Sequence, residues 1–431
     1  MNSIRKELKK GVALNTVFTE KFKTNIFSVN LIFPFFPENN SYYALIVQML
    51  RQGCKKYPSV AALAGKLDEL YASDLAFGLS TLGESQILTI SADFLRNRCL
   101  DEQMDLYKEV LGCLFDVLSC PLLDEKGENF RKDIIESETR HLTDIIRAKF
   151  NNKTVYAMDR CRELMCEGEP FAVNGNGTEE MLSKIDPSRL YAMYKELFLK
   201  SRVEMFFVGD ESSERVESLI QPLLALFSAT PNEILIPEKI SAPKNVREFT
   251  EPADTVQSKL CMGFRLTRDG FVDESVLSKM FLTVFSASPV SKLFVHVREE
   301  KSLCYYCNMH MEYWKGIGFV NAGIAKEKKE ETVSAVLEQL ELMKNGSVTE
   351  EELLAAKTFY IASLRYVEDA PKGIEAYLLK KIILGEKADI GEDTRLVNAI
   401  TVEDIARFAK TVCLDSVYLL EATKGGKEDE A

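Results

Sequence analysis

Residues 291–306 of this chain read SKLFVHVREEKSLCYY, and the rest of the sequence is best interpreted around this stretch. An apolar segment with helical spacing runs into Arg298, and Tyr305 follows where a β-type pattern begins. An arginine fork can grip a peptide carbonyl, and a tyrosine hydroxyl can donate to an oxyanion. The two residues therefore indicate binding of an extended peptide or of its tetrahedral intermediate. Neither group activates water, so the nucleophile would have to come from elsewhere.

Composition and charge exclude several classes of protein. At 431 residues the chain is too long for one ordinary core, so two or more domains are expected. The net charge of −12 argues against nucleic acids and anionic membranes as partners, because both demand clustered lysine and arginine. The longest uncharged apolar run, at 42–50, is far shorter than the ~20 residues that span a bilayer.

The cellular location is expected to be the cytoplasm. The N-terminal MNSIRKELKK stays charged where a signal peptide has an apolar region. Ten cysteines without regular spacing are typical of reduced thiols in a cytoplasmic protein of this size.

One order of elements occurs twice along the chain. The elements expected in the first half are a strand at 26–33, helices at 42–50 and 56–70, strands at 75–82 and 86–92, helices at 101–118, from 124 past 138, from 178 and from 186, and a strand at 203–208. Strands at 259–266, 317–323 and 417–420, with helices capped by Thr349 and Thr401, repeat this order. We interpret the repetition as an internal duplication.

The duplication predicts two domains and a fold class. Residues 1–228 form the first domain, residues 229–244 form a proline-containing linker, and residues 245–431 form the second domain. Each copy has a few strands and many helices, which mostly do not alternate singly with the strands. This favours an α+β fold with helices packed on one face of a mostly antiparallel sheet, in two tandem homologous domains, over a doubly wound parallel sheet.

Two stretches together resemble the pitrilysin-type inverted-motif zinc peptidases, the family of insulin-degrading enzyme and mitochondrial processing peptidase. They are SYYALIVQMLRQGCKKYPS at 41–59 and the stretch at 291–306. The resemblance covers nearly the whole chain. It implies two peptidase-like domains that form a clam shell, half of a peptidase chamber, with a degenerate zinc motif in the first and an arginine–tyrosine element in the second.

The resemblance also implies that the metal site is lost. Active members carry His-x-x-Glu-His on the buried helix, and a glutamate on a later helix completes the zinc site. The corresponding positions here are Ala44, Val47 and Gln48, which supply neither imidazole nor general base. The third ligand corresponds to Glu138, and a supporting acidic residue corresponds to Arg131, whose positive charge repels a metal ion. No metal and no cofactor are therefore expected in this chain.

The function that the resemblance implies is non-catalytic. In the bacterial branch made of two half-length chains, one chain carries zinc, and its partner supplies arginine and tyrosine across the interface. This sequence looks like the partner, with Arg298 and Tyr305 acting on a peptide or an unfolded protein segment at the zinc of a homologous subunit. It departs from the family pattern at 286–288, which reads Ser-Ala-Ser, and at Ser302, where glycines are usual.

Other interpretations stay open from the sequence. The chain could be a self-assembling peptide-binding or scaffold protein, such as a homodimer, that cleaves nothing, or a peptidase that uses other chemistry. Arg298 could be an ordinary helix-terminal arginine, Tyr305 a strand aromatic and Glu138 a solvated helix residue. Cys304 and Cys307 match a redox or metal spacing, but residues three apart in a strand point to opposite faces, which favours two separate buried thiols.

Overall fold

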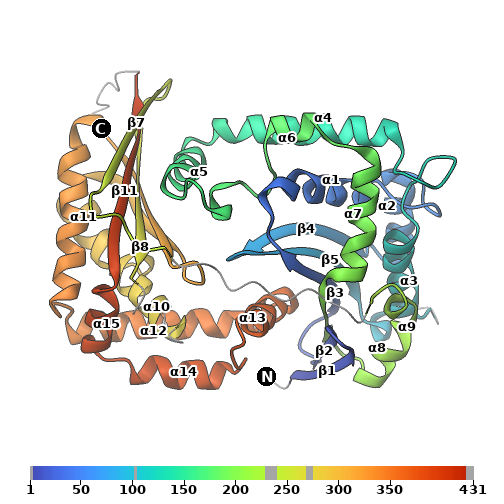
Figure 1. The fold of residues 1–431 in the computed structure, drawn as a ribbon. Helices are drawn as coiled ribbons and strands as arrows, with labels where there is room; N and C mark the ends of the chain where they lie inside the picture. The colour runs from blue at the N-terminus through green and yellow to red at the C-terminus, as the bar shows by residue number, and fades with distance from the viewer. Residues whose placement is uncertain (1–2, 101–103, 229–239, 268–274, 424–431) are drawn as a thin grey trace. The chain divides into compact units, whose positions relative to one another are not determined.

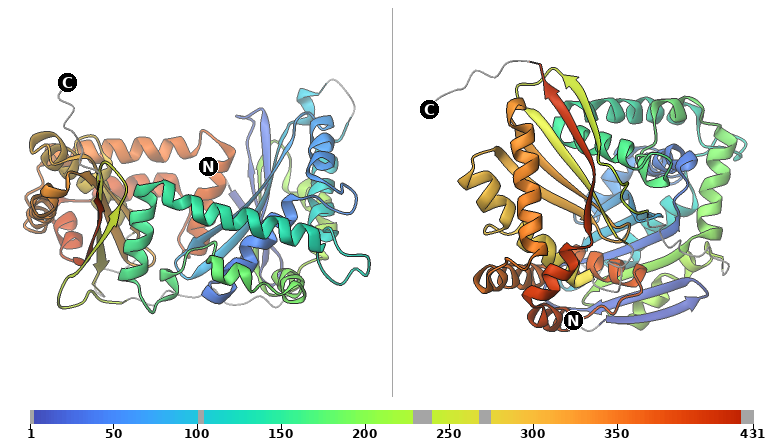
Figure 2. Two further views of the ribbon diagram at one scale, coloured as in Figure 1. Left: turned by 90° about the horizontal axis from the view of Figure 1, so that it is seen from above. Right: turned by 60° about the vertical axis from the view of Figure 1, so that its left-hand side comes forward.

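The computed structural model describes residues 3–100, 104–228, 240–267 and 275–423. They fall into two units, each built on one β-sheet with helices on both faces (Figures 1 and 2). Unit 1 comprises Met1–Arg147, Val173–Ile236 and Val367–Ala388, and unit 2 comprises Ala148–Ala172, Pro237–Tyr366 and Asp389–Ala431.

The sheet of unit 1 has the strand order β1-β2-β6-β3-β5-β4. Its strands are β1 (Ser3–Lys9), β2 (Val12–Phe18), β3 (Thr24–Pro34), β4 (Asp74–Leu82), β5 (Ser85–Leu95) and β6 (Arg202–Gly209). β2 and β6 are parallel, and the other neighbouring strands are antiparallel. The central strand β3 is buried along nearly its whole length, because both faces of the sheet are covered.

The sheet of unit 2 has the order β7-β11-β8-β10-β9. Its strands are β7 (Arg247–Ala253), β8 (Ser258–Leu266), β9 (Cys304–Glu312), β10 (Ile317–Ile324) and β11 (Val412–Ala422). β7 and β11 are parallel, and the remaining pairs are antiparallel. This order matches β2-β6-β3-β5-β4 of unit 1, including the parallel pair. The predicted fold class, two similar α+β domains with mostly antiparallel sheets, is confirmed.

The helices surround these sheets. Those of unit 1 are α1 (Asn40–Arg51), α2 (Val60–Glu69), α3 (Leu106–Ser119), α4 (Lys132–Ala148), α6 (Glu179–Ser183), α7 (Pro187–Lys200), α8 (Ser213–Leu219), α9 (Gln221–Leu224) and α13 (Pro371–Ile383). Those of unit 2 are α5 (Lys153–Met165), α10 (Ser275–Leu282), the π-helices η6 (Thr283–Ala287) and η7 (Leu293–Glu300), α11 (Lys329–Lys344), α12 (Glu350–Val367), α14 (Ile390–Ala399) and α15 (Val402–Ala409). Within the described part of the chain, none of these helices is both long enough and apolar enough to cross a membrane.

Side-chain caps fix the starts of several helices where the sequence predicts them. Asp186 accepts a hydrogen bond of 2.8 Å from the backbone N–H of Ser188 at the start of α7. Thr349 and Glu352 accept hydrogen bonds from each other's backbone N–H groups at the start of α12. Thr401 opens α15 with a full capping box. Each cap satisfies N–H groups that the first helical turn leaves without a partner.

The helix boundary that differs most from its prediction is the start of α4. The helix expected from Asp124 begins instead at Lys132. The Asp124 carboxylate accepts a 3.0 Å hydrogen bond from the backbone N–H of Glu128, and Gly127 has a φ of +71°. A carboxylate that bonds nearby backbone competes with helix formation, and the left-handed glycine reverses the chain. Asp124 therefore closes a turn.

Each sheet has one face covered by helices from its own half of the sequence and the other face covered by a helix from the opposite half. The expectation that helices pack on only one face of each sheet is therefore wrong. In unit 1, α1, α3 and α7 cover one face, and α13 of the C-terminal half covers the other. Ile374 and Leu378 of α13 pack there against Val17, Phe206 and Val208.

Unit 2 shows the reciprocal arrangement. Helices α10, α11 and α15 cover one face of its sheet. Helix α5 of the N-terminal half covers the other face, with Ala157, Cys161 and Met165 in the core (Figure 1). The predicted division at 228 and 245 separates the two sheets, while α5 and α13 cross it. Residues 229–239 of the predicted linker lie outside the described residues.

Buried ions attach the segment after α5 to the sheet of unit 2. Glu169, which follows α5, pairs with Arg265 and lies 3.1 Å from the ammonium of Lys315. Arg265 also donates from Nε to Asp415 at 2.8 Å, and Arg247 pairs with the same carboxylate. Arg265, Lys315 and Asp415 are almost fully buried. Charges buried this deeply are tolerated only when they are paired. The network therefore fixes the position of the segment that follows α5.

Candidate peptide-binding site and degenerate metal site

Helix α1 carries the positions of the predicted metal motif inside the core of unit 1. Ala44 and Val47 are each 3 % exposed, and Gln48 is 8 % exposed. The amide oxygen of Gln48 accepts a hydrogen bond of 3.3 Å from Arg51, whose other terminal nitrogen donates to the carbonyl of Phe77 at 2.6 Å. A methyl group, an isopropyl group and a neutral amide give zinc none of the imidazole, thiolate or carboxylate ligands that it takes in proteins.

Glu138, the predicted remnant of the third ligand, is buried on α4. Burial raises the pKa of its carboxyl, although the charges of His141 and Arg51 oppose this shift. Arg51 thus bonds the amide of Gln48 and acts electrostatically on Glu138. The guanidinium of Arg51 therefore interacts with two positions of the degenerate metal site, Gln48 and Glu138. The sequence did not single out Arg51, because its relation to Glu138 depends on how α4 packs near α1.

Arg131 lies just before α4, and Asp133 compensates its charge locally. Its guanidinium donates two hydrogen bonds to Asp133, of 3.1 and 2.6 Å, at the surface of the unit. The separation of seven positions from Arg131 to Glu138 corresponds to about 10 Å along a helix. Within the residues that the structure describes, no three histidine, cysteine, aspartate or glutamate side chains form a group that could hold a metal ion.

Arg298 lies near the end of the π-helix η7. Its guanidinium lies 4.9 Å from the centroid of the Phe294 ring, and its Nε lies 3.5 Å from the carboxylate of Glu299. Leu293 and Val297 anchor this helix in the core. Short π-helical segments are rare and often occur at functional sites. The side chain of Arg298 is 41 % exposed, so its N–H donors are open to a ligand.

Between Arg298 and Tyr305 the chain turns at Ser302, which has a φ of +48°. The backbone N–H of Leu303 donates to the carbonyl of Val297 at 3.2 Å, which closes the helix end. Lys328 donates to the carbonyl of Ser302 at 2.9 Å. Ser302 therefore adopts the left-handed conformation that glycine enters without strain, and neighbouring contacts hold it there.

Tyr305 is the extra residue of a β-bulge in β9, the strand at one edge of its sheet. Along the β9–β10 pair, Tyr306 opposes Gly323 and Cys304 opposes Ile324, so Tyr305 has no cross-strand partner. Bulges redirect side chains and are frequent next to active sites. Tyr305 is 74 % exposed, so its phenol is open to solvent.

The bulge sends the flanking side chains to opposite faces of the sheet. The hydroxyl oxygen of Tyr306 lies 2.9 Å from that of Thr154 on α5. Cys304 and Cys307 both pack on the other face, against the same hydrophobic core. The expectation that these two thiols point to opposite faces is wrong, because Tyr305 adds one residue to the spacing between them.

The segment at 286–288 also contacts β9. The backbone N–H of Met309 donates to the hydroxyl of Ser286 at 2.5 Å, and Ser286 and Ser288 are both buried. A serine at 286 thus supplies a hydroxyl anchor that glycine lacks. This departure from the family pattern fixes η6 to the strand that carries Tyr305.

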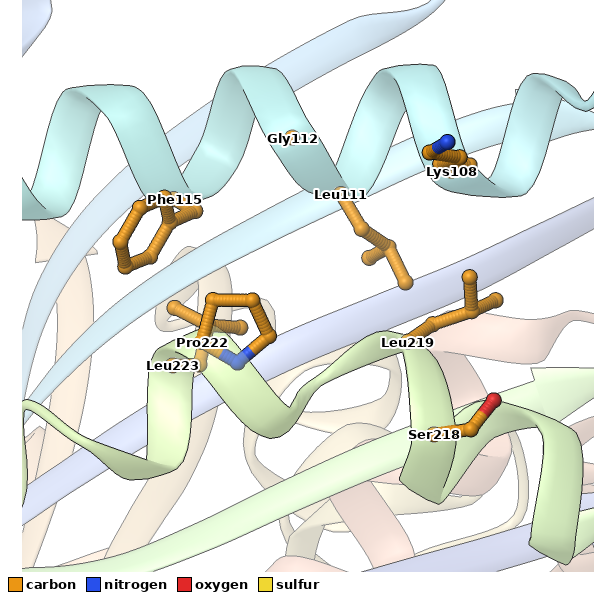
Figure 3. Close-up of a pocket in the computed structure, with 8 residues that line it drawn as sticks. All are labelled: Lys108, Leu111, Gly112, Phe115, Ser218, Leu219, Pro222 and Leu223. Carbon is orange, nitrogen blue, oxygen red and sulfur yellow. The ribbon is translucent and has the colours of Figure 1, made fainter.

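A separate pocket of about 310 Å³ lies in unit 1, between α3 and the α8–α9 segment. Leu111 and Phe115 from α3 face Leu219 and Leu223 across it, and Lys108 contributes the charged group of its lining (Figure 3). The lining has no carboxylate, imidazole or thiol. The pocket contains none of the predicted site residues and offers no acid–base pair.

Comparisons with known proteins agree with this architecture. Residues 184–360 match the family described as Peptidase M16 inactive domain. The chain is 28 % identical over 418 residues to the "Probable inactive metalloprotease YmfF" of Bacillus subtilis (strain 168), a match that covers 96 % of this chain and 97 % of that protein.

Solved structures show the same fold over the whole chain. A conserved protein from Enterococcus faecalis V583 superposes with a TM-score of 0.88 at 22 % identity and covers 100 % of both chains. The peptidase M16 inactive domain from Pseudomonas fluorescens gives a TM-score of 0.81 at 18 % identity and covers 99 % of both. The chain is thus similar to an inactive domain of the M16, or pitrilysin-type, peptidases and to a relative described as a probable inactive metalloprotease. Its own helix of the metal motif carries Ala44, Val47 and Gln48.

Proposed function

We propose that this chain is the non-catalytic subunit of a cytoplasmic two-chain zinc peptidase. In this proposal it forms half of the peptidase chamber and contributes Arg298 and Tyr305 to a peptide at the zinc of a homologous partner. The chain itself holds no zinc or other cofactor. Its similarity to the M16 peptidases supports a role in a peptidase. The side chains of α1, which supply no zinc ligand, support a role without a metal of its own.

The observation that carries the proposal is the exposure of Tyr305 at the β9 bulge, beyond the turn that follows Arg298. Tyr305 is 74 % exposed, whereas its neighbour Tyr306 is bound to Thr154. An exposed phenol on a bulged edge strand has no evident packing role. A hydroxyl held on a rigid strand suits donation to a charge that develops on a bound peptide.

The two side chains perform different parts of the reaction. A zinc ion held by the partner would supply Lewis-acid chemistry, polarising the peptide carbonyl and activating the attacking water. Tyr305 donates its O–H to the oxyanion that forms when the carbonyl is attacked, so it acts mainly in the transition state. Arg298, held on Phe294, grips another peptide carbonyl in the ground state and the transition state alike, so it acts mainly on binding.

The test is reconstitution with a zinc subunit. A half-length chain that carries His-x-x-Glu-His is sought beside this reading frame and co-purified with it, and peptide cleavage by the mixture is followed. Tyr305→Phe should lower turnover on the order of 10²–10³-fold with little change in the Michaelis constant. Arg298→Ala should mainly raise the Michaelis constant.

Matched controls exist on α12 of the same unit. Tyr366 is 73 % exposed, and Arg365 is exposed beside it. Tyr366→Phe and Arg365→Ala should cleave like wild type. If Tyr305→Phe and Arg298→Ala also cleave like wild type, or if no partner yields cleavage, the chain is a scaffold or self-assembling peptide-binding protein instead.

A further inference from the structure

The β9 bulge places two thiols side by side. Cys304 opposes Ile324 and Cys307 opposes Ala322 on β10, two positions that share one face of that strand. Both cysteines pack against the same hydrophobic core. Without the bulge, residues three apart would lie on opposite faces. The extra residue, Tyr305, therefore creates the pairing.

The two thiols differ in access and in charge. Cys304 is half-buried, whereas Cys307 is buried. A hydrogen bond from the Cys307 thiol lowers the pKa of Cys304, and the positive charges of Arg298 and Lys328 lower it further, against the effect of burial. The same hydrogen bond and burial raise the pKa of Cys307 well above its usual range. Cys304 has the properties of an attacking thiolate, and Cys307 those of a resolving thiol.

We propose that Cys304 and Cys307 form a redox-active dithiol that closes to a disulfide across the bulge when it meets a low-molecular-weight disulfide such as glutathione disulfide. The Cys304 thiolate attacks one sulfur of the small disulfide, forms a mixed disulfide and releases one thiolate. Cys307 then loses its proton and attacks the Cys304 sulfur, which forms the internal disulfide and releases the second small thiolate. The two cysteine protons pass to the two released thiolates. Two protein thiols and one small disulfide are consumed, and one protein disulfide and two small thiols are formed.

Closure of this disulfide acts on Tyr305, since the phenol lies between the two linked residues. A disulfide holds its two Cα atoms about 4.4–6.8 Å apart, which fixes the bulge and the direction of the Tyr305 side chain. This consequence rests on the proposed function. Oxidation would then change cleavage by the mixed complex, through the turnover number more than through the Michaelis constant.

The test of the dithiol needs no partner subunit. The full chain is reduced, incubated with glutathione disulfide, alkylated, and digested with trypsin after denaturation. Both cysteines lie on one tryptic peptide, residues 302–315. In wild type this peptide should be lighter by two hydrogen atoms than its reduced form and should resist alkylation. Reduction with dithiothreitol should restore two alkylation sites.

Variants separate the two roles, and exposed thiols serve as controls. Cys307→Ser should trap glutathione on Cys304, whereas Cys304→Ser should leave Cys307 unmodified. Cys99 and Cys120 are exposed and should gain glutathione at most, without an internal bond. Because Cys307 is buried, Cys307→Ala is made as a second version in case the serine impairs folding.

Two outcomes would overturn the dithiol. In one, the 302–315 peptide stays fully reduced while Cys99 and Cys120 take up glutathione. In the other, wild type stops at a mixed disulfide on Cys304. If the disulfide forms but cleavage by the mixed complex does not change, the dithiol stands and only its link to Tyr305 is lost.

Discussion

Asn30 donates a hydrogen bond of 3.2 Å from its side-chain amide to the carboxyl of Glu375, a residue from the opposite half of the chain. Ser28 donates to the same oxygen. Glu375 is 7 % exposed, and burial raises the pKa of its carboxyl despite these hydrogen bonds and the charge of Lys372. Helix α13 is thus attached to the sheet of unit 1 by a carboxyl whose pKa is raised by burial.

Glu375→Gln should stabilise the protein at neutral pH. Because the pKa of Glu375 is higher in the folded state than in the unfolded state, the folded protein keeps this proton to a higher pH. That stabilisation is complete below the unfolded pKa and is lost as the pH rises through the folded pKa. The neutral amide keeps the hydrogen-bonding atoms and carries no charge to desolvate. The urea midpoints of wild type and variant should therefore separate as the pH rises from below the unfolded pKa of Glu375 through its folded pKa.

Glu204→Gln is the matched comparison with the opposite sign. Burial alone would raise the pKa of Glu204, but hydrogen bonds from Arg5, Asn15 and Arg202 lower it overall. Its contribution to stability is present above the unfolded pKa and is lost as the pH falls through the folded pKa. The variant should lose on the order of 1–3 kcal/mol at neutral pH, because the partly exposed guanidinium groups of Arg5 and Arg202 lose their charged partner. Equal shifts in both variants would contradict the two pKa directions.

Val47→Glu should destabilise the chain at neutral pH by about 3 kcal/mol or more, because an unpaired carboxylate enters an apolar core. Gln48→Glu is the control on the same helix, since Arg51 lies within hydrogen-bonding distance and can pair with the new carboxylate. It should cost clearly less. Thermal melts of the two variants measure the difference. A Val47→Glu protein that melts like wild type would mean that this face of α1 is hydrated.

Elemental analysis of the dialysed protein should show no stoichiometric zinc at neutral pH, because Ala44, Val47 and Gln48 offer no ligand. In a chain with the three motif residues restored as histidine, glutamate and histidine, Arg51→Ala should increase zinc uptake, since a guanidinium beside the site opposes a divalent cation. One zinc per wild-type chain would place a metal site elsewhere in the molecule.

Ser302→Gly should leave stability within about 1 kcal/mol of wild type, because relief of the left-handed strain is offset by the greater freedom of glycine in the unfolded state. Ser302→Val should cost about 1–3 kcal/mol, because a β-branched residue tolerates this conformation poorly. Urea unfolding checks both. A fully tolerated valine would show that the turn before Tyr305 adopts another conformation.

Tyr305→Phe and Arg298→Ala should each change the melting temperature of the isolated chain by less than the equivalent of about 0.5 kcal/mol, because substitutions at exposed positions rarely cost more. Tyr306→Phe is the internal contrast, since it removes the hydroxyl that faces Thr154 and should cost about 1 kcal/mol. Differential scanning calorimetry of the three variants gives the comparison. A large loss from Tyr305→Phe would indicate a packing role.

The sequence predicts the features whose signals are local. The apolar run at 42–50 predicts α1, and the caps at Asp186, Thr349 and Thr401 predict helix starts, because neighbouring residues decide both. β1 was missed because its sequence, SIRKELK, is an exposed edge strand without apolar alternation. Such a strand is defined by pairing with β2, which is not a local signal.

The site is predictable in part for the same reason. Arg298 and Tyr305 stand out by residue type and spacing. The bulge at Tyr305, the pairing of Cys304 with Cys307 and the electrostatic relation of Arg51 to Glu138 depend on strand register and helix packing. No window of the sequence contains that information, because each relation is decided by a second strand or helix.

The reciprocal exchange of α5 and α13 determines when the protein can fold on the ribosome. When a nascent chain has emerged only as far as β6, α5 has been synthesised, but the strands β8 and β11 on which it packs have not. Its first sheet meanwhile lacks the cover that Ile374 and Leu378 provide. Neither unit is complete until translation passes Ile383. Loop closure over such long sequence separations is slow. Both halves of the chain therefore expose apolar surface at the same time during synthesis, and neither half is fully folded before the other.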